Sequence, residues 1–341
     1  MDEGGAGSKD TAPVKRFVAL LTAFGAVLPL AASAQTPSTG SGQAYPARAI
    51  RFIVPFAPGG GNDILGRVVA QKLNEGFGVP VVVDNRGGAG GTIGTDITAK
   101  SPPDGYTLLI NNLSLAVNIT LYSKLPYDTL KDLQPVTLVG RQPNILVVHP
   151  SLPVKSLKEL LALAKARPGQ LAYSSGGVGS SSHLAGELLR WIAKIDVIHV
   201  PYKGMGPAMV DLVSGQVQMS MATMASALPH VRSNRMRPIA VTTARRVAVV
   251  PEVPTMMEAG LTEYEHSTWY GILVPARTPG PVVARLNSEL RKIVASDDVK
   301  QKFNPQGVEP DSSTPEEFSA FLRSEAEKWA KVVKGAGLRA N

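Results

Sequence analysis

The stretch "IRFIVPFAPGGGNDILGRVV", Ile50–Val69, joins a short apolar run to an amphipathic one through three consecutive glycines. The first run is short, unbroken and followed by proline, which predicts a buried β-strand. Beyond the glycines, apolar residues recur at helical spacing until Gly78, and this predicts an α-helix. A strand, a Gly-rich turn and a helix in this order are typical of a parallel sheet covered by helices.

A second glycine loop lies in the middle of the chain, within "LAYSSGGVGSSSHLAGEL", Leu171–Leu188. Each loop, at Gly59–Gly61 and at Gly176–Gly179, follows a predicted strand and begins a predicted helix. In open α/β sheets, ligands bind at this end of the strands. Further strands are predicted at residues 79–86, 106–110, 144–150, 196–204, 216–223 and 269–276.

Two α/β units of this kind predict a two-lobed protein in which the second lobe is inserted into the first. We assign residues 45–142 and 266–341 to lobe 1 and residues 143–265 to lobe 2, with a cleft between them. The C-terminal helix begins at a capping box, Thr314–Glu317, and is expected to pack back on lobe 1. Its residues expected to face inward are Phe318, Phe321, Leu322, Trp329 and Val332.

The N-terminal segment has the pattern of an export signal. Lys15 and Arg16 precede an apolar run, Phe17–Ala32, which ends in the small residues of a signal-peptidase site. We therefore predict a signal peptide at residues 1–34 and a flexible leader at residues 35–44. A membrane anchor is the alternative, but the run is short for a span, which takes about 20 residues.

The chain contains no cysteine, which excludes disulfides, thiolate metal sites, a cysteine nucleophile and a lipid anchor. The mature protein is therefore expected to be a soluble periplasmic protein. Asp2, Glu3 and Asp10 are unusual in the basic start of a signal peptide, so translation from Val14 is an open alternative to Met1.

The net charge of +8 favours anionic partners. Nucleic acid is discounted, because the basic residues are scattered and few aromatic residues lie among them. Steering of small anions toward the protein is the favoured interpretation. The protein is expected to act as a monomer.

The two glycine loops are suited to hold an anion. A helix N-terminus offers free N–H groups and about half a positive charge, and glycine lets a ligand approach the backbone closely. Two such ends facing across a cleft could hold one anion without a basic side chain. Neither loop ends in the Gly-Lys-Ser/Thr of a phosphate-binding loop, and Gly177–Ser182 lacks the last glycine of a dinucleotide fingerprint.

Catalytic and metal motifs are absent from the sequence. Ser180–His183 are consecutive and do not face each other on a helix, so N-capping and ligand hydrogen bonds are favoured over nucleophilic catalysis. The histidines show no zinc spacing, and no cofactor motif is complete.

Met219 and Met221 are expected on one face of a strand, in the core or lining a pocket. Trp269 and Tyr270 are expected either to shape the cleft or to pack at the hinge.

Several motifs that span nearly all of Tyr45–Leu338 occur in a fixed order: "IRFIVPFAPGGGND", "NRGGAGGTIG", "SPPDGYTLL", "YSSGGVGSSSHLAGEL", "HVPYKGMGPAMVDLVSGQV", "PEVPTMMEAG", "WYGILVPARTP" and "STPEEF". Together they resemble the Bug family, the periplasmic solute receptors of tripartite tricarboxylate transporters. The resemblance implies an α/β, two-lobed type II periplasmic binding protein, or Venus flytrap, with the second lobe inserted in the first.

The resemblance also implies that the two glycine loops hold one ligand carboxylate through N–H groups, hydroxyls and waters. In lobe 1 this role falls on Ala57, Gly59, Gly60 and Asn62. In lobe 2 it falls on Ser175, Gly177, Gly179, Ser180 and Ser181. Asn111 and Asn112, expected in the turn after a strand, should also face the cleft. Lys203 is a candidate partner for a second carboxylate, with a solvated surface lysine as the alternative.

The chain departs from the family at Gln218 and Ala222, near which the family commonly has acidic residues. We expect a more apolar, methionine-lined pocket wall. The hypothesis is a monocarboxylate or dicarboxylate with an apolar or aromatic body, and not an amino acid.

The expected function is capture of a small organic acid for the membrane subunits of a tripartite tricarboxylate-type transporter, without catalysis. One alternative is a sensor partner that presents its ligand to a membrane signalling protein. Another is an exported enzyme acting on organic acids, against which the missing catalytic motifs argue.

Overall fold

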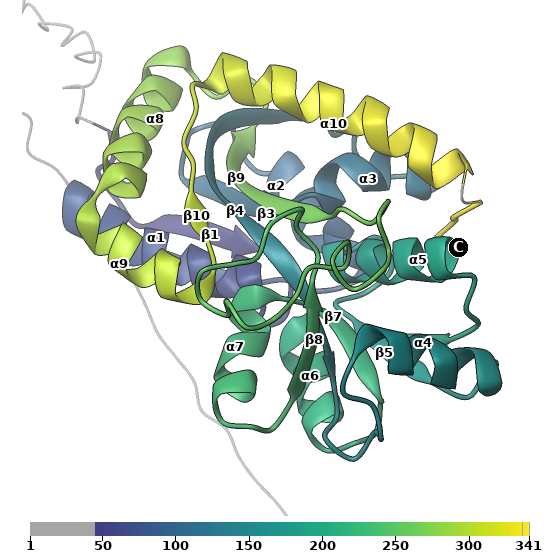
Figure 1. Cartoon of the computed structure of the whole chain (residues 1–341). Coiled ribbons are helices and arrows are strands. Elements are labelled where there is room, and N and C mark those ends of the chain that lie inside the picture. Colours follow the sequence, from purple (N-terminus) through teal and green to yellow (C-terminus); the bar gives the residue numbers. More distant parts are fainter. Residues whose placement is uncertain (1–44, 336, 341) are drawn as a thin grey trace, which may run out of the picture. The chain divides into compact units, whose positions relative to one another are not determined.

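The computed structural model describes residues 45–335 and 337–340. The predicted signal peptide, the leader at residues 35–44 and the alternative start at Val14 lie outside the described residues. Within the described part, strands form one mixed sheet with helices on both faces (Figure 1). In the same part of the chain, no helix has the length and apolar character needed to cross a membrane.

The sheet has the order β2-β1-β3-β9-β4-β7-β5-β6, and β8 and β10 also pair with β4. The strands are β1 (Ile50–Val54), β2 (Val81–Asn85), β3 (Thr107–Asn112), β4 (Leu133–Val148), β5 (Ala172–Ser175), β6 (Ile198–Pro201), β7 (Met219–Thr223), β8 (Arg237–Val241), β9 (Ser267–Pro275) and β10 (Glu309–Pro310).

The α-helices are α1 (Gly61–Phe77), α2 (Thr92–Ala99), α3 (Ser114–Leu121), α4 (Leu157–Ala166), α5 (Ser181–Ala193), α6 (Met205–Val213), α7 (Met224–Arg232), α8 (Gly280–Ala295), α9 (Asp297–Phe303) and α10 (Pro315–Gly335). Two short 3₁₀-helices are η1 (Ala89–Gly91) and η2 (Asn304–Gln306).

Strand β4 connects the two halves of the sheet. Its first part pairs with β9 as far as Pro143, and its last part pairs with β7 from Asn144 onward. The strand predicted at residues 144–150 therefore covers only the end of β4, and the expected length was wrong. Pro135 and Pro143 hid the earlier part, because proline is uncommon inside a central strand.

Alternating strand residues build a core on each face of both halves. In the first half, Phe52 shares a core with α1 and α8, while Ile53 shares one with α3 and α10. In the second half, Leu146 packs with α4 and α5, while Ile145 packs with α6 and α7. Successive strand residues point to opposite faces, so a sheet covered on both sides needs nearly continuous apolar strands.

Capping interactions mark the start of α4 and, at the predicted capping box, the start of α10. Ser156 Oγ accepts a hydrogen bond from the Glu159 N–H at 3.2 Å. At α10 the exchange is reciprocal, since Thr314 Oγ1 accepts from the Glu317 N–H and Glu317 Oε2 accepts from the Thr314 N–H. Helix α10 then packs against α3 and β4.

One inward-facing residue of α10 was predicted wrongly. Val332 is 37% exposed, whereas Val333 is 2% exposed and belongs to the core. Helical periodicity explains the difference, because Trp329 and Val333 are four residues apart and share a face, while Val332 lies beside that face. Phe321 is only partly buried.

Candidate ligand-binding site

A small cavity lies where the two glycine loops meet. Its volume is about 20 Å³, enough for about one or two water molecules. Its lining residues are Phe56, Gly60, Gly61, Asn62, Asn112, Gly176, Ser181, Ser182, Met205, Thr223 and Tyr270. Among the described residues, no side chain that lines the cavity carries a charge, so the groups that face the cavity directly are backbone, hydroxyl and amide dipoles.

Four helices begin at this cavity. They are α1, which starts at Gly61, α5, which starts at Ser181, α6, which starts at Met205, and α7, whose N-cap is Thr223. Each helix N-terminus carries a partial positive charge, and these charges act together on the shared space. The sequence predicted two converging helix ends, and the structure has four. Such an arrangement favours an anion.

Three of these helices have no side-chain cap. Gly60 and Gly204 precede α1 and α6 and have no side chain that could accept a hydrogen bond. At α7, the Thr223 hydroxyl pairs with the Ser226 hydroxyl at 2.6 Å and does not cap the helix. The first N–H groups of a helix have no partner within it, so these three helices offer donors to a ligand atom.

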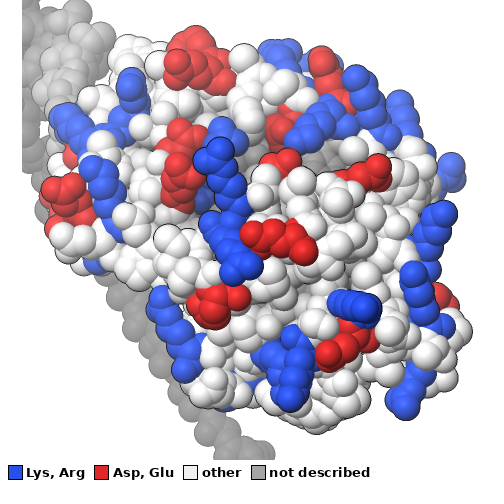
Figure 2. Space-filling view, viewed as in Figure 1, with Lys and Arg blue, Asp and Glu red and all other residues white. Residues whose placement is uncertain are grey.

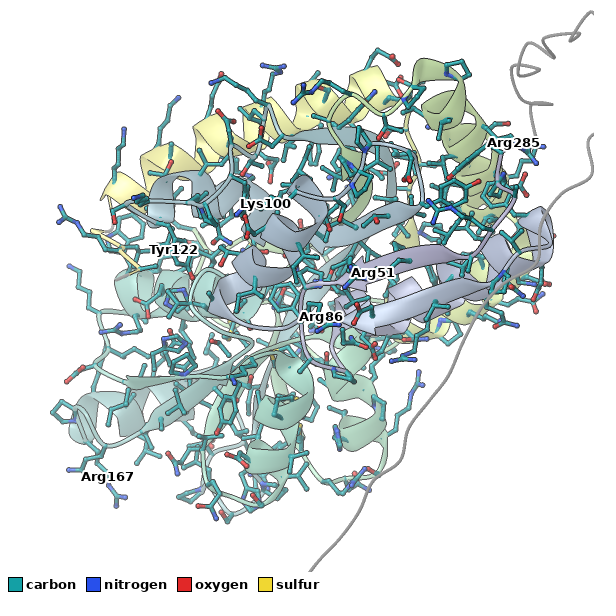
Figure 3. All side chains as sticks on the ribbon, turned by 180° about the vertical axis from the view of Figure 1, so that it is seen from behind. Arg51, Arg86, Lys100, Tyr122, Arg167 and Arg285 are labelled. Carbon is teal, nitrogen blue, oxygen red and sulfur yellow. The ribbon has the colours of Figure 1, made fainter. Side chains whose placement is uncertain are left out.

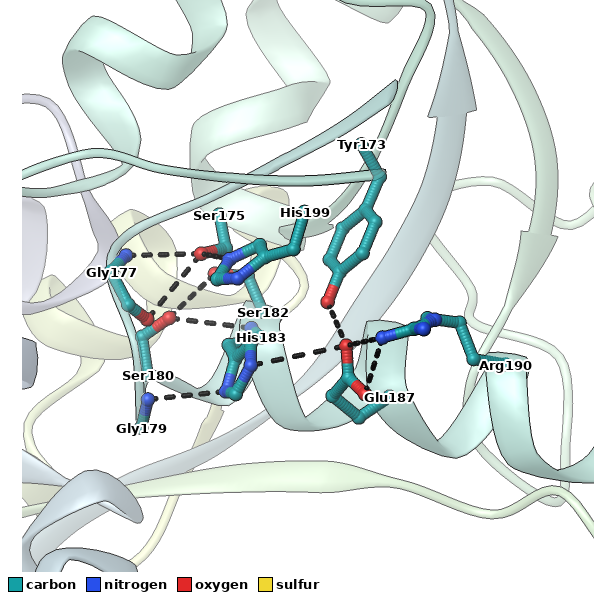
Figure 4. A network of polar contacts seen from close by, with 10 residues as sticks. All are labelled: Tyr173, Ser175, Gly177, Gly179, Ser180, Ser182, His183, Glu187, Arg190 and His199. Carbon is teal, nitrogen blue, oxygen red and sulfur yellow. Dashed lines mark hydrogen bonds and ion pairs between the residues drawn. The ribbon is translucent and has the colours of Figure 1, made fainter. Parts of the chain in front are cut away.

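The second glycine loop binds its own N–H groups (Figure 4). The Gly177 N–H donates to Ser175 Oγ at 3.1 Å, and the Gly179 N–H donates to His183 Nδ1 at 3.2 Å. Ser180 is the N-cap of α5, and its hydroxyl accepts a hydrogen bond from the His183 N–H. The predicted capping role of Ser180 is confirmed.

Burial keeps the histidines under this loop neutral. It lowers the pKa of His183 to about 4 and that of His199 to about 3, and the two rings lie 4.3 Å apart. Since His183 Nδ1 accepts a hydrogen bond, its proton lies on Nε2, 3.9 Å from Glu187 Oε1. Burial opposes ionisation of Glu187, but hydrogen bonds from Tyr173 and Arg190 outweigh it and lower the pKa of that carboxyl.

Some of the residues predicted to bind the ligand line the cavity: Gly60, Asn62, Asn112 and Ser181. Asn62 Oδ1 is buried and has no hydrogen-bond partner among the described residues. Ser181 Oγ donates to Asn144 Oδ1 at 3.0 Å and lies 2.9 Å from His266 Nε2. These contacts fix the orientation of the Ser181 hydroxyl at the wall of the cavity.

The other predicted residues contact protein groups beside the cavity. The Ala57 N–H donates to the Lys203 carbonyl at 2.9 Å, and the Gly59 N–H donates to Asp63 Oδ2 at 3.0 Å. Lys203 is an exposed residue that does not line the cavity. The residues that take part in the hydrogen bonds of the second loop are Ser175, Gly177, Gly179 and Ser180.

Asn111 and Asn112 end β3, and the expected turn position was wrong. Successive strand residues point to opposite faces, so Asn112 lines the cavity and Asn111 does not. Asn111 Nδ2 donates to Thr95 Oγ1 at 3.0 Å, and its Oδ1 accepts from the Ser114 hydroxyl at 3.1 Å. Asn111 therefore holds neighbouring elements together behind the cavity.

The same alternation separates Trp269 from Tyr270. Tyr270 lines the cavity, and its hydroxyl donates to Gln142 Oε1 at 2.8 Å. Trp269 faces the opposite side of β9, where its Nε1 donates to Glu325 Oε2 at 3.0 Å. Of the two aromatic residues, Tyr270 shapes the cavity and Trp269 packs against α10.

Of the two positions expected for Met219 and Met221, the core is confirmed and the pocket lining is not. Met219 and Met221 lie in the core with Leu146, because every residue of β7 is buried between helices. The methionine that lines the cavity is Met205, at the start of α6.

The residues chosen for the ligand did not include part of the lining: Phe56, Gly61, Gly176, Ser182, Met205 and Thr223. Gly61, Gly176 and Ser182 belong to the predicted loops and differ from the chosen residues only in position along the turn. Thr223 could have been found, since it ends a predicted strand at the side of the sheet where ligands bind.

A larger hollow of about 720 Å³ lies away from the glycine loops and is lined in part by Arg141, Arg245 and Val247. None of the four converging helix starts lines it. We regard the small cavity as the candidate site, because the N-termini of helices from both halves of the sheet converge on it and can hold an anion.

Basic side chains are distributed over the surface. In Figure 2, Lys and Arg alternate with Asp and Glu on the face shown. On the far face, Arg51 and Arg86 pair with Asp84, and Lys100 pairs with Asp96 (Figure 3). These basic residues are neutralised locally and do not form a stripe.

Two α/β halves joined through β4, with helix N-termini converging between them, define a two-lobed periplasmic binding protein of the type II, Venus-flytrap kind. Such proteins are solute receptors.

The chain belongs to the tripartite tricarboxylate transporter family of receptors, whose family model matches residues 65–338. Protein BugT of Bordetella pertussis is 42% identical over 301 residues, covering 88% of this chain and 92% of BugT. The structure of Rpa4515 of R. palustris with adipate has a TM-score of 0.84 at 35% identity, covering 86% of this chain and 99% of that one. MatC from Rhodopseudomonas palustris with bound malate has a TM-score of 0.81 at 31% identity, covering 85% and 100%. This chain is therefore a family member with the periplasmic receptor fold.

Proposed function

We propose that this protein captures a small organic carboxylate between its two lobes and presents it to the membrane subunits of a tripartite tricarboxylate-type transporter. The observation that carries the proposal is the convergence of four helix N-termini, three of them without side-chain caps, on one cavity. Within residues 45–335 and 337–340, no charged side chain lines that cavity. The relatives Rpa4515, described with adipate, and MatC, described with malate, support a carboxylate ligand.

The lining supports a ligand whose body is uncharged. An ammonium group in a buried site needs an anionic partner, and no carboxylate of the described residues lines this cavity. Gln218, at one position where the family commonly has an acidic residue, uses its Oε1 to accept from the Ala172 N–H at 2.9 Å. We therefore infer a monocarboxylate or dicarboxylate with an apolar or aromatic body, and not an amino acid.

Closure of two lobes is the proposed mechanism of capture. We infer that residues 45–142 with 266–341 form lobe 1 and that residues 143–265 form lobe 2. The change of β4 partner between Pro143 and Asn144 supports this division. A ligand stabilises the closed arrangement only if it contacts both lobes. Gly61 and Asn112 come from one proposed lobe, and Ser181 and Thr223 from the other.

A panel of organic acids tests the proposal. The protein is unfolded and refolded to remove carried-over ligand, and the melting temperature is measured with each acid, because a ligand of the folded state raises it. We expect stabilisation by at least one monocarboxylate or dicarboxylate, with calorimetry giving its affinity. Tight binding of aspartate or glutamate, with no response to other acids, would contradict the ligand class.

We also propose export by the N-terminal segment, with cleavage after Ala34. N-terminal sequencing of protein from a periplasmic fraction should begin at Gln35. A start upstream of Ala34 in that fraction would argue against the proposed cleavage site.

A further inference from the structure

The two proposed lobes touch beside the cavity through backbone atoms. The Ala57 N–H in the first glycine loop donates to the Lys203 carbonyl at 2.9 Å. Gly206, three residues after Lys203, packs against the first glycine loop. A Cβ added to Gly59 of that loop would lie 3.2 Å from the Cα of Gly206. Met205, between these two contacts, lines the cavity. The turn Lys203–Gly206 therefore joins the lobe contact to the cavity wall.

Glycine at position 206 is not needed by its own backbone. Gly206 lies in the first turn of α6 and has no left-handed φ, so alanine would suit the helix better. A Cβ at this position would collide with the carbonyl oxygen of Pro58, in the opposite lobe. The close approach of the two lobes is thus the feature that requires glycine here.

At the second glycine loop, another glycine of one proposed lobe lies against a carbonyl oxygen of the other. A Cβ on Gly90, in η1, would collide with the carbonyl oxygen of Val178 in the second loop. Gly90 has a left-handed backbone, with φ of 60°, which asparagine tolerates better than other side chains do. At both of these backbone contacts between the lobes, a glycine allows the close approach.

We propose that the turn Lys203–Gly206 is a docking element that sets ligand affinity, with Gly206 as the positioning residue that fixes how closely the lobes approach. The inference rests on the proposed function as a closing receptor. The turn holds the closed arrangement and carries Met205 into the cavity wall only when docked. Loss of docking should speed ligand release, because affinity differences within one interface lie mostly in the dissociation rate.

The central experiment compares Gly206→Ala with Gly280→Ala. Both glycines lie in the first turn of a helix, but a Cβ on Gly280 would meet no atom within 4 Å. Affinity and dissociation rate are measured for the acid that binds the wild type most tightly, and the melting temperature is measured without ligand. The distance between lobes is followed with spin labels on cysteines introduced at Lys100 and Arg167, since the chain has no other cysteine.

We expect Gly206→Ala to bind about tenfold to 100-fold more weakly than the wild type, with a faster dissociation rate. Its melting temperature without ligand should be unchanged or higher. Ligand should shift the lobe distance in the wild type and in Gly280→Ala, and should shift it less in Gly206→Ala. A role of Gly206 in folding alone would lower the melting temperature and leave the lobe distance unaffected.

Gly90→Asn tests the second contact independently and covers the case that Gly206→Ala folds poorly. Wild-type affinity in Gly206→Ala, or in Gly90→Asn if only that variant folds, overturns the docking proposal while the proposed function stands. Failure of every acid to bind the wild type overturns the proposed function, and the docking role with it.

Discussion

The two glycine loops have similar sequences but use their backbone N–H groups differently. In the first loop, Gly60 is the N-cap of α1 and offers no acceptor to the donors that follow it. In the second loop, Ser180 is the N-cap of α5 and its hydroxyl accepts from the His183 N–H, while the Gly179 N–H donates to His183 Nδ1. In the first loop the Gly59 N–H donates to Asp63 Oδ2, but the first N–H groups of α1 have no side-chain cap. The second loop is braced by its own side chains as far as the cap of α5.

This difference suggests a division of labour at the cavity. A braced loop places the Ser181 and Ser182 hydroxyls without further ordering, which lowers the entropic cost of binding. The uncapped N–H groups at the starts of α1, α6 and α7 can then donate hydrogen bonds to a bound anion. Two loops of similar sequence can therefore contribute differently to binding, the second through positioned hydroxyls and the first through uncapped N–H groups.

A larger side chain at Gly61, in the first glycine loop, should reduce ligand affinity more than any other change considered. A Cβ on Gly61 would collide with the Tyr270 hydroxyl, and Gly61 lines the cavity. We expect Gly61→Val to weaken carboxylate binding about 100-fold or more, since it blocks both the space and the approach to the helix N–H groups. Calorimetry on this variant and on Gly280→Val, where a Cβ meets nothing, measures the effect. Comparable affinities in the two variants would place the ligand elsewhere.

Removing the brace of the second loop should affect stability and affinity together. In His183→Ala, the Gly179 N–H loses its buried acceptor, which costs about 2 kcal/mol of unfolding free energy. A looser loop should also weaken ligand binding, by about tenfold. Urea unfolding and calorimetry report the two effects, with His149→Ala as a matched control in a partly exposed position. Full affinity in a destabilised His183→Ala would show that bracing serves the fold alone.

Acid should act on the second loop through its histidines. Burial lowers the pKa of His183 to about 4 and that of His199 to about 3, against about 6.5 in an unfolded chain. Glu187 and Arg190 also face the pair, with opposite effects on its charge. Above about pH 6.5, the two imidazoles are neutral in both the folded and the unfolded chain, so they do not lower the free energy of unfolding. As the pH falls toward about 4, the unfolded chain takes up protons that the folded chain excludes, so stability is lost.

The loss should approach about 1.4 kcal/mol per pH unit for each histidine in this window. His266 should add to it, because burial lowers its pKa to about 3. Urea unfolding at a series of pH values measures the slope. A free energy of unfolding that stays constant from neutral pH down to about pH 4 would mean that the histidines are not held neutral.

The sequence predicted the part of the site that local patterns encode. The loop that contains Gly60 could be found because a glycine loop between strand and helix has a known chemistry, and the family resemblance added Asn62 and Ser181. Met205 reaches the cavity only through the packing of α6, which no local pattern reports. The bracing of the second loop was also out of reach, because it depends on the imidazole of His183 folding back one helical turn.

The fold was predictable in its strands and helix caps and less so at its centre. Strand β4 crosses both halves, yet its polar and proline-containing part around Gln142 and Pro143 has no apolar pattern. A strand buried by partners on both sides can tolerate such residues, because neighbours satisfy their polar groups. Gln142, for example, accepts from the Tyr270 hydroxyl and donates to the Gln306 carbonyl.

The smallest expected effect comes from converting the open loop into a capped one. Gly60 has an extended backbone, φ −91° and ψ 168°, and a Cβ there would make ordinary contacts of 3.6 Å with Met205. In Gly60→Ser, the new hydroxyl should cap α1, with only a few tenths of a kcal/mol gained in stability. It should also take an N–H group that the ligand would use, so affinity should fall about threefold to tenfold. Gly280→Ser is the control, and calorimetry with chemical denaturation gives both values. Unchanged affinity in a stabilised Gly60→Ser would show that the open donors of α1 are not used by the ligand, and the contrast between the two loops would then be one of folding alone.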